Sequence, residues 1–485
     1  MPEETNDKPE DKKKDEDLKF EEEKPSVTKH QLKLGKAVLK YTATAGRMPI
    51  FNEKGEIDAQ IFYAAYVKDG LRNKAKRPLT FVFNGGPGSP SCWLHLGALG
   101  PRRVKMGKDG FMPKAPYQLV DNQSTWLDET DLVFIDPIGT GHSRARNIEL
   151  SKKAWGLQGD LESVGEFMRM YLVRNERWSS PLFLAGESYG TTRAAGLAGY
   201  LVDQGIAFNG IVLISSILNF QTARFVQGND LPYILFLPTY AAAAWYHGKL
   251  DKSFKDIHKT LEAARKFASG PYAAALTKGD TITGKEYDKM VKDVARFTGL
   301  SESYVDACNL RIKIQGFCKE LRRDEHRTIG RLDSRFVGIN KEVVGEEFDH
   351  DPSMSGIMPP FTACYNDYVR GTLGYKTDFP YEIFKGVKEP WDWGSAGEGH
   401  PDTSDHLRKA MTKNPHMKVH VCSGYYDLAT PFYATEYTLA HMGLDPELEG
   451  NFSLSEYEAG HMMYIHEPSL KKFKTDCVGF IKRNK

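Results

Sequence analysis

A serine in a turn flanked by glycines is the first residue whose setting points to chemistry. Ser188 lies in the run G-E-S-Y-G at residues 186–190, after an apolar run at 181–185 and before a run rich in alanine and glycine at 191–201. A strand, a sharp turn and a helix in this order form a nucleophile elbow, which holds the serine Oγ above a sheet. We therefore expect Ser188 to be a catalytic nucleophile; the alternative is an ordinary turn between a strand and a helix.

A serine hydroxyl becomes a good nucleophile when a histidine takes its proton and an acid orients that histidine. In enzymes with a nucleophile elbow, the acid follows the serine in the chain and the histidine comes last. Asp427 follows an apolar run at 418–423, and His461 follows a strand-like run at 451–457. We expect these two residues to complete the triad. The other C-terminal histidines are predicted to be surface or packing residues: His416, His420, His441 and His466.

A glycine-rich loop could supply the remaining part of such a site. The run N-G-G-P-G-S at 84–89 follows an apolar run at 79–83. Glycines leave backbone N–H groups uncovered, so these groups can approach a reacting oxygen. An ordinary turn is the alternative. In hydrolases of this topology, an early loop and the residue after the nucleophile, here Tyr189, form the oxyanion hole.

The elements that must position these residues follow from the hydrophobic pattern. Short apolar runs alternate with longer helical patterns, which is typical of an α/β sheet covered on both faces. Two extended runs, 37–44 and 59–67, predict an antiparallel hairpin near the N-terminus. The strand signal disappears between about 219 and 380, where the chain is helical and rich in aromatic residues. Those aromatic residues either fill the core of this insertion or line a pocket.

We divide the chain accordingly. The expected parts are a disordered charged tail at 1–25, a first core segment at 26–219, a helical cap insertion at 220–380 and a second core segment at 381–485. The first 24 residues hold eleven acidic residues and six lysines without an apolar cluster. Such a segment buries too little surface to order itself.

The composition argues against several other functions. Lys and Arg number 65 against 64 Asp and Glu, so no nucleic-acid partner is expected. The apolar run at 231–246 is short and contains two prolines, which argues against a membrane span. No basic start precedes an apolar stretch, so the sequence as given predicts a cytoplasmic protein, or an exported one if a leader has been removed. The oligomeric state stays open between monomer and homodimer.

Four motifs together resemble those of the serine carboxypeptidases. They are N-G-G-P-G-S at 84–89, L-V-F-I-D-P-I-G-T-G at 132–141, G-E-S-Y-G at 186–190 and G-H-M at 460–462. The resemblance covers roughly residues 36 to 481. It implies an α/β-hydrolase fold with a central, mostly parallel sheet, N-terminal antiparallel strands and a helical cap.

The resemblance also implies roles for the site residues. Ser188, Asp427 and His461 would form the triad, and the N–H groups of Gly86 and Tyr189 would form the oxyanion hole. The carboxylate at the end of the substrate would be bound by three residues: Asn84, Gly85 and Glu187. Glu187 can hold a carboxylate well only when it is protonated, because two ionised carboxylates repel each other.

Three positions depart from the better-known eukaryotic members and look like the bacterial branch of the family. Ala98 replaces a second glutamate, Val82 replaces a tryptophan and Thr430 replaces a cysteine. Without the second glutamate, no pair of acids shares a proton, so we do not expect a strongly acidic pH optimum.

The resulting expectation is a serine exopeptidase that removes C-terminal residues from peptides with a free C-terminus. It needs no cofactor or metal, and no Cys, His, Asp or Glu cluster has metal-binding spacing in the sequence. An esterase or acyltransferase on the same scaffold is the first alternative. Asn84 and Glu187 argue against it, because an esterase has no use for a carboxylate clamp. A non-catalytic binding protein is the second alternative, and the intact Ser, Asp and His argue against it.

Overall fold

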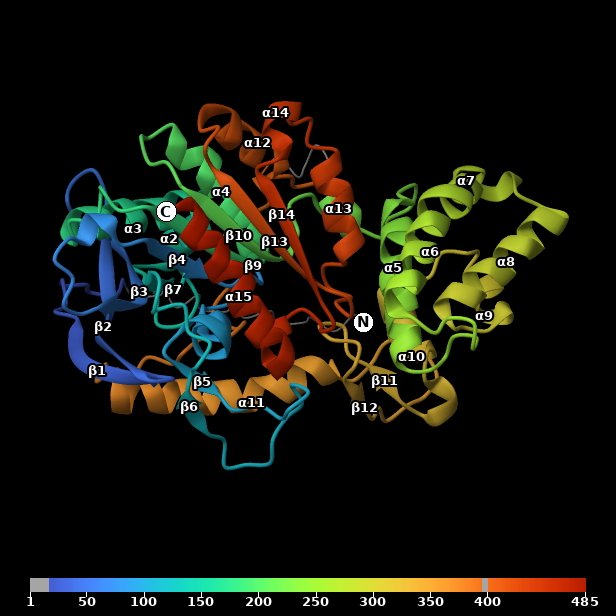
Figure 1. Ribbon diagram of the computed structural model, residues 1–485, viewed down its shortest axis with the longest axis horizontal. Coiled ribbons are helices and arrows are strands. Elements are labelled where there is room, and N and C mark those ends of the chain that lie inside the picture. The colour runs from blue at the N-terminus through green and yellow to red at the C-terminus, as the bar shows by residue number, and fades with distance from the viewer. Residues whose placement is uncertain (1–16, 395–399) are drawn as a thin grey trace, which may run out of the picture.

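A large mixed sheet forms the centre of the molecule (Figure 1). The computed structural model describes residues 17–394 and 400–485. The strand order is β1-β2-β3-β7-β4-β9-β10-β13-β14, with β8 paired to β3. The strands are β1 Ser26–Leu34, β2 Ala37–Phe51, β3 Ile57–Lys68, β4 Leu79–Phe83, β7 Asp131–Ile135, β8 Arg144–Ala145, β9 Leu182–Ser188, β10 Gly210–Ser216, β13 Lys418–Gly424 and β14 Phe452–Tyr457.

The sheet has an antiparallel part and a parallel part. Strands β1, β2 and β3 pair antiparallel, and β3 also runs antiparallel to β7. From β7 to β14, every pair is parallel. Because the carboxyl ends of parallel strands meet at one edge, loops after β4, β9 and β13 can share a site there.

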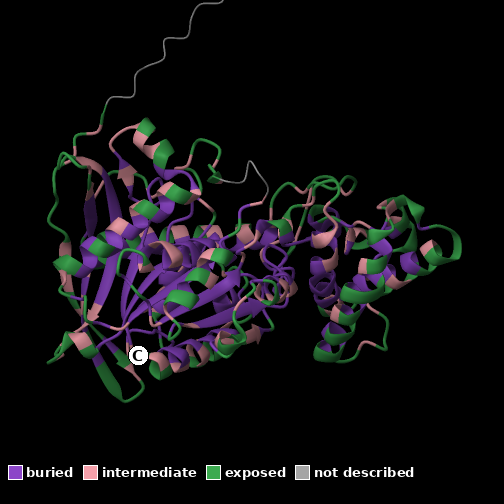
Figure 2. Ribbon diagram, turned by 90° about the horizontal axis from the view of Figure 1, so that it is seen from above, coloured by how far each residue is buried: buried purple, intermediate pink, exposed green. Residues whose placement is uncertain are grey.

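Alternate residues of the parallel strands enter two separate cores. In β10, Ile211 and Leu213 pack with helices α3, α4 and α12, whereas Val212 and Ile214 pack on the opposite face with α11 and α15. This period of two is what a strand covered on both faces requires. Buried residues concentrate along the strands and the helices next to them (Figure 2).

Helices cover both faces of the sheet and build a separate lobe (Figure 1). They are α1 Cys92–Leu94, α2 Ile148–Ala154, α3 Leu157–Arg174, α4 Tyr189–Val202, α5 Leu231–Tyr246, α6 Ile257–Phe267, α7 Ala273–Thr277, α8 Gly284–Thr298, α9 Glu302–Ala307, α10 Ile314–Glu320, α11 Pro352–Asp367, α12 Ser404–Lys413, α13 Phe432–Ala440, α14 Pro446–Glu449 and α15 Glu467–Asn484. Short 3₁₀ or π turns lie at Lys74–Lys76, His95–Leu99, Phe220–Ala223, Ala268–Tyr272, Gly279–Thr281, Arg323–Glu325, Tyr368–Thr372 and Met463–Ile465.

The lobe formed by α5 to α10 has a core of its own. Phe236 and Tyr240 of α5 are buried in it, and the ring of Tyr240 stacks on Phe317 of α10 at 4.1 Å. These aromatic side chains therefore serve as core rather than as the lining of a pocket. The region expected to lack strands contains two short ones, β11 Thr328–Ile329 and β12 Val337–Gly338. A two-residue strand is too short to leave a periodic pattern in the sequence.

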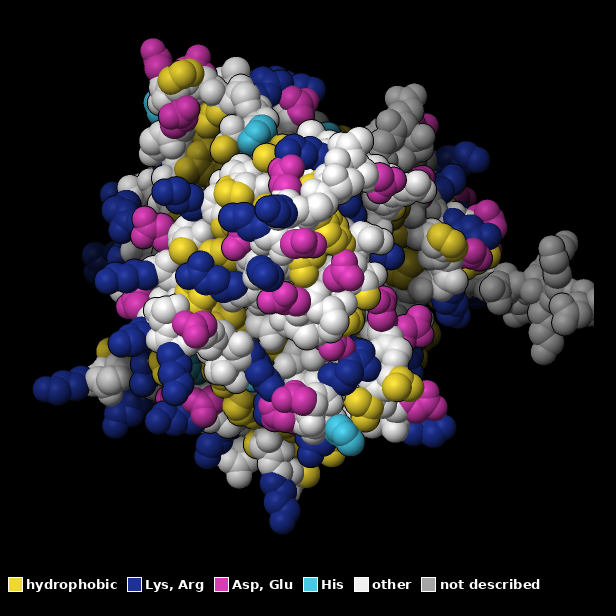
Figure 3. All heavy atoms as spheres, turned by 90° about the vertical axis from the view of Figure 1, so that its right-hand side faces the viewer, with side chains coloured by type: hydrophobic (Ala, Val, Ile, Leu, Met, Phe, Trp, Pro, Cys, Tyr) yellow, Lys and Arg dark blue, Asp and Glu magenta, His cyan; other side chains and the backbone are white. Residues whose placement is uncertain are grey.

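Strands β5 Arg102–Val104 and β6 Leu119–Asp121 form a separate hairpin. Among residues 17–394 and 400–485, no helix combines the length and apolar character that crossing a bilayer requires. On the face at the outer end of the lobe, basic and acidic side chains are interspersed (Figure 3).

The tail expected at 1–25 lies only partly within the described residues. Residues 1–16 are outside them. Residues 17–25, expected to be disordered, lie against the core instead: the N–H of Leu18 donates to Arg146 O at 2.8 Å, and Gln60 Nε2 donates to Glu21 O at 2.7 Å. Backbone hydrogen bonds and ion pairs to arginines hold this acidic segment in place, and such long-range partners are not visible in its composition.

Candidate active site

Ser188 lies at the junction of β9 and α4, in a strained backbone conformation. Its φ of 59° and ψ of −130° fall in a region that non-glycine residues rarely adopt. The flanking glycines make this turn possible. A Cβ on Gly186 would lie 2.1 Å from Gly190 O, and a Cβ on Gly190 would lie 2.8 Å from Phe83 O. The local structure is therefore that of a nucleophile elbow.

His461 and Asp427 form a short, buried hydrogen bond. The distance from His461 Nδ1 to Asp427 Oδ2 is 2.7 Å, and Asp427 is fully buried. The backbone N–H groups of Ala429 and Thr430 donate to Asp427 Oδ1 at 2.8 and 3.1 Å. These donors fix the orientation of the carboxyl group toward the imidazole.

The imidazole is held from its backbone as well. The N–H of His461 donates to Leu332 O at 2.7 Å, and Ser215 Oγ donates to His461 O at 2.6 Å. Burial alone would lower the pKa of His461, but the negative charge of Asp427 and the hydrogen bond to it outweigh burial, so the pKa is raised above 6.5. The arrangement thus favours a histidine that can accept a proton through Nε2 and hold the resulting charge.

Seven of the eight predicted site residues line one cavity, and the eighth, Asp427, contacts His461 but is not part of the lining. It encloses about 790 Å³, including the space at its open mouth. Its lining includes Ser188, His461, Glu187, Asn84, Gly85, Gly86 and Tyr189. Within the described chain, no hydrogen bond joins Ser188 to His461. Catalytic hydrogen bonds of this kind are often long without substrate.

Two backbone N–H groups are available near Ser188. Tyr189 is the first residue of α4, so its N–H is one of the donors that lack an intrahelical acceptor. Gly86 has a φ of 106°, which glycine adopts without strain. The loop before it lies close to the elbow, because a Cβ on Gly85 would lie 2.4 Å from the backbone nitrogen of Tyr189.

Glu187 is buried beside Asn84. Asn84 Nδ2 donates to Glu187 Oε1 at 3.0 Å, and the N–H of Leu94 donates to Asn84 Oδ1 at 3.0 Å, which fixes the amide orientation. Glu187 Oε2 is buried and has no hydrogen-bond partner among the described residues. Burial raises the pKa of Glu187 to about 7, although the neighbouring His461, the nearby hydroxyl of Tyr464 and the bond from Asn84 act in the opposite direction. The carboxyl can therefore be protonated near neutral pH.

Three residues that hold these groups received no such role from the sequence, although Thr430 stood out there as a departure from the family. Thr430 Oγ1 donates to Asp427 Oδ2 at 2.7 Å and lies 3.2 Å from His461 Nδ1. Arg193 pairs with Asp160 at 2.8 Å, and its Nη1 donates to Asn84 O at 2.7 Å. Both members of this pair are buried, and the hydroxyl of Tyr189 donates to Asp160 Oδ2 at 3.1 Å. Arg193 and Asp160 lie on different helices, so no local pattern could reveal their pairing. Thr430 is three residues from Asp427, but only the folded loop shows that their side chains meet.

Known proteins resemble this chain along most of its length. The family profile described as serine carboxypeptidase matches residues 50–469. Pheromone-processing carboxypeptidase KEX1 of Saccharomyces cerevisiae is 30% identical over 156 residues, which is 30% of this chain and 20% of that protein. Serine carboxypeptidase-like 11 of Arabidopsis thaliana is 29% identical over 174 residues, or 34% of this chain and 38% of that protein. Both alignments thus span well under two thirds of the relative's length.

One solved structure is similar over nearly the whole chain. The crystal structure of KEX1(Δ)p, a prohormone-processing carboxypeptidase from Saccharomyces cerevisiae, matches with a TM-score of 0.54 and 15% identity, over 91% of each chain. At this identity the likeness concerns the fold alone. It confirms the fold class expected from the sequence, an α/β-hydrolase sheet with N-terminal antiparallel strands and a helical insertion.

Proposed function

Because the chain belongs to the serine carboxypeptidase family, we propose that it hydrolyses the last peptide bond of peptides that carry a free C-terminal carboxylate. The observation that carries the proposal is the pairing of Glu187 with Asn84 in the cavity that also holds Ser188 and His461. A protonatable acid beside an amide donor is suited to a terminal carboxylate, and neither an ester nor an internal peptide bond offers that group.

Ser188 would attack the carbonyl carbon of the last peptide bond. His461 would take the serine proton through Nε2 and then give it to the nitrogen of the departing amino acid. Asp427, 2.7 Å from His461 Nδ1, would orient the ring and stabilise its charged form. The resulting acyl-enzyme would be resolved by water, activated by the same histidine.

The oxyanion of the tetrahedral intermediate would be stabilised by the N–H groups of Gly86 and Tyr189. The support for this role is that both residues line the cavity with Ser188. The substrate carboxylate would be bound by Asn84, the Gly85 backbone and protonated Glu187. Glu187 Oε2, which has no partner of its own, is the atom available to donate.

The lobe would act as the cap expected at 220–380. Arg331 and Leu332, which follow β11, belong to the lining of the cavity, so the lobe side contributes to its wall. Helix α11 lies within the expected range, but its buried residues belong to the core beneath the sheet. We therefore place the end of the cap before Pro352. A wall on this side would admit a chain end rather than the middle of a chain.

The test compares three substrates that differ only at the C-terminus. An N-blocked dipeptide with a free carboxylate, its C-terminal amide and its methyl ester are assayed at pH 6 to 8 with the native enzyme and with Ser188→Ala. We expect cleavage of the free acid, weak action on the amide and loss of all activity in the variant. The control is Ser163→Ala, an exchange in α3 outside the cavity.

A different pattern would contradict the proposal. If the ester alone were cleaved, the carboxylate clamp would be wrong and an esterase would be the better interpretation. If Ser188→Ala retained activity, or a fluorophosphonate failed to label the native protein at Ser188, the nucleophile assignment would fail.

A further inference from the structure

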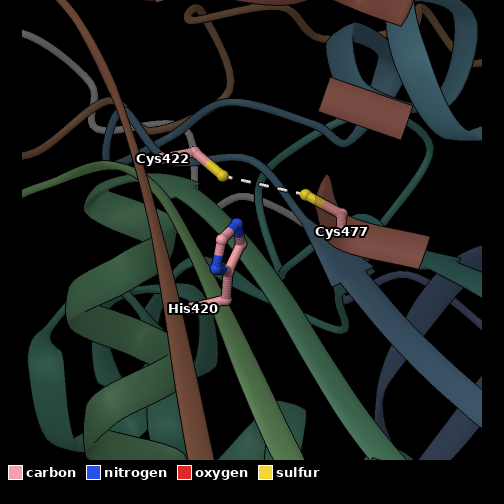
Figure 4. Close-up of side chains that lie close together, drawn as sticks. All are labelled: His420, Cys422 and Cys477. Atoms are coloured by element: carbon pink, nitrogen blue, oxygen red, sulfur yellow. Dashed lines mark hydrogen bonds between the residues drawn. The ribbon is translucent and has the colours of Figure 1, made fainter. Parts of the chain in front are cut away.

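Three soft metal-ligand side chains converge on the face of the sheet covered by α15. His420 and Cys422 are two residues apart in β13, so both point to the same face. Cys477 lies on α15 and faces them. All three residues are buried. In Figure 4, the two sulfurs point toward each other and the imidazole points toward both.

The spacing of the donor atoms fits a single metal ion. The sulfurs of Cys422 and Cys477 are 3.7 Å apart, and one donor atom from each residue lies within 4.8 Å of the others. Two sulfurs on a tetrahedral zinc ion, each about 2.3 Å from the metal, lie about 3.8 Å apart. The two sulfurs therefore already stand at the separation that such an ion requires.

The hydrogen bonding of His420 suits a metal ligand. His420 Nδ1 is 2.8 Å from Ser453 Oγ on β14, which leaves Nε2 as the free ring nitrogen. Nε2 is buried and has no hydrogen-bond partner. A buried nitrogen without a partner is costly. A second hydrogen bond that fixes the ring and the tautomer is the usual companion of a metal-bound histidine.

The charge balance also suits a divalent ion. Two thiolates neutralise two positive charges, so the bound site would be neutral as a whole in its apolar surroundings. The hydroxyl of Tyr457 lies 3.7 Å from Cys422 Sγ and donates to Asp476 at 2.8 Å. Thiolate and imidazole ligands together favour zinc over magnesium or calcium.

We propose that His420, Cys422 and Cys477 bind one zinc-class cation that ties α15 to β13. The site lies apart from the catalytic cavity, and none of its three ligands lines that cavity. Its position in the fold connects it to the catalytic residues. β13 ends at Gly424, three residues before Asp427, and β14 leads toward His461, so the ion would brace the strands that carry the acid and the base.

A disulfide between Cys422 and Cys477 is the competing use of the same sulfurs. It would require them to approach to about 2 Å, and it would not involve His420. The two possibilities therefore differ in the role of His420, which a metal site requires and a disulfide does not.

The experiment uses full-length protein produced in minimal medium supplemented with cobalt or with zinc, because a buried site fills during folding. It is purified under reducing conditions. We expect about one metal ion per chain by elemental analysis, and the cobalt form should show thiolate-to-cobalt charge-transfer and tetrahedral d–d absorption. His420→Ala and Cys477→Ser should each reduce the metal content at least tenfold. Cys318→Ser, a buried cysteine in the lobe core, is the matched control and should keep it.

The native protein alone can overturn the proposal, so the outcome does not depend on whether the variants fold. Native protein from both media with far less than one ion per chain and no thiolate-to-cobalt absorption would refute it. A Cys422–Cys477 disulfide in metal-free protein, formed equally well in His420→Ala, would assign the sulfurs to redox chemistry instead. Metal content that survives His420→Ala and Cys477→Ser would place the ion elsewhere.

Discussion

The side-chain amide of Asn84 lies 3.0 Å from Glu187 Oε1, and it is oriented by the backbone N–H of Leu94. One oxygen of Glu187 is thereby satisfied, while the other stays buried without a partner. The carboxyl is thus held in a single orientation with one oxygen free to carry a proton. Because burial raises its pKa to about 7, its ionisation falls within the range where the enzyme would work.

The pH dependence of substrate affinity follows from Glu187. In the proposed role, its protonated form would bind the substrate carboxylate, and this form is present below the raised pKa and lost as pH rises through it. We expect KM for a free-acid peptide to rise about fivefold from pH 7 to pH 8 in the native enzyme. In Glu187→Gln, whose amide donates at every pH, this rise should disappear. Steady-state kinetics at constant ionic strength measures both.

The amide of the same peptide is the control for this effect, because it carries no terminal charge and its KM should stay flat. The falling limb of kcat at low pH reports protonation of His461 and should remain in Glu187→Gln. A native KM independent of pH would exclude Glu187 from carboxylate binding.

Thr430 is expected to position the catalytic pair. Its hydroxyl donates to Asp427 Oδ2, the same oxygen that contacts His461. Thr430→Val keeps the shape and removes this donor, so we expect kcat to fall about tenfold, or about 1.4 kcal/mol. The pH at half-maximal kcat should also move, because the charge on Asp427 sets the pKa of His461. Thr438→Val in α13, whose hydroxyl contacts only Ala434 O, is the control. If Thr430→Val and Thr438→Val had the same kcat and the same pH profile, the positioning role of Thr430 would be ruled out.

The buried pair of Arg193 and Asp160 is expected to matter for stability. Arg193→Met leaves a buried carboxylate without its partner, so the free energy of unfolding should fall by about 3–5 kcal/mol. The double variant Asp160→Leu, Arg193→Met removes both charges and should be more stable than the single variant. Urea denaturation measures the free energy of unfolding of the native protein and of each variant. A double variant destabilised by the full sum of the two single changes would contradict the coupling.

Gly190 is expected to tolerate no side chain. In Gly190→Ala, the new Cβ would meet Phe83 O at 2.8 Å and Asn84 O at 2.9 Å, pushing the glycine loop away from the elbow. We expect a loss of about 1–3 kcal/mol in stability and a large loss of kcat/KM. Gly270→Ala is the control, since its Cβ would contact nothing within 4 Å. Thermal unfolding and peptide hydrolysis check both. Unchanged activity in Gly190→Ala would show that catalysis does not require the close approach of the glycine loop to the elbow.

Much of the fold could be predicted because its signals are local. The runs at 79–83 and 131–135 coincide with β4 and β7, and the hairpin before them is present as β2 and β3. The resemblance to serine carboxypeptidases is likewise confirmed. The end of the lobe was harder to predict, because α11 looks like any other helix in sequence and only its packing shows that it belongs to the sheet.

The sequence by itself predicted Ser188, Asp427 and His461 in their chain order, together with the glycines around them. An elbow or a loop after a strand depends on neighbours in the chain, so its pattern can be recognised in the sequence. The sequence also predicted Glu187 as a carboxylate ligand. Only the tertiary structure decided that Glu187 lies buried against Asn84, that Thr430 supports Asp427, and that His420 meets two cysteines. The contacts of Glu187 with Asn84 and of His420 with Cys477 join segments far apart in the chain, and such contacts leave no periodic trace in the order of residues. Thr430 is only three residues from Asp427, but whether their side chains meet depends on the conformation of the folded loop.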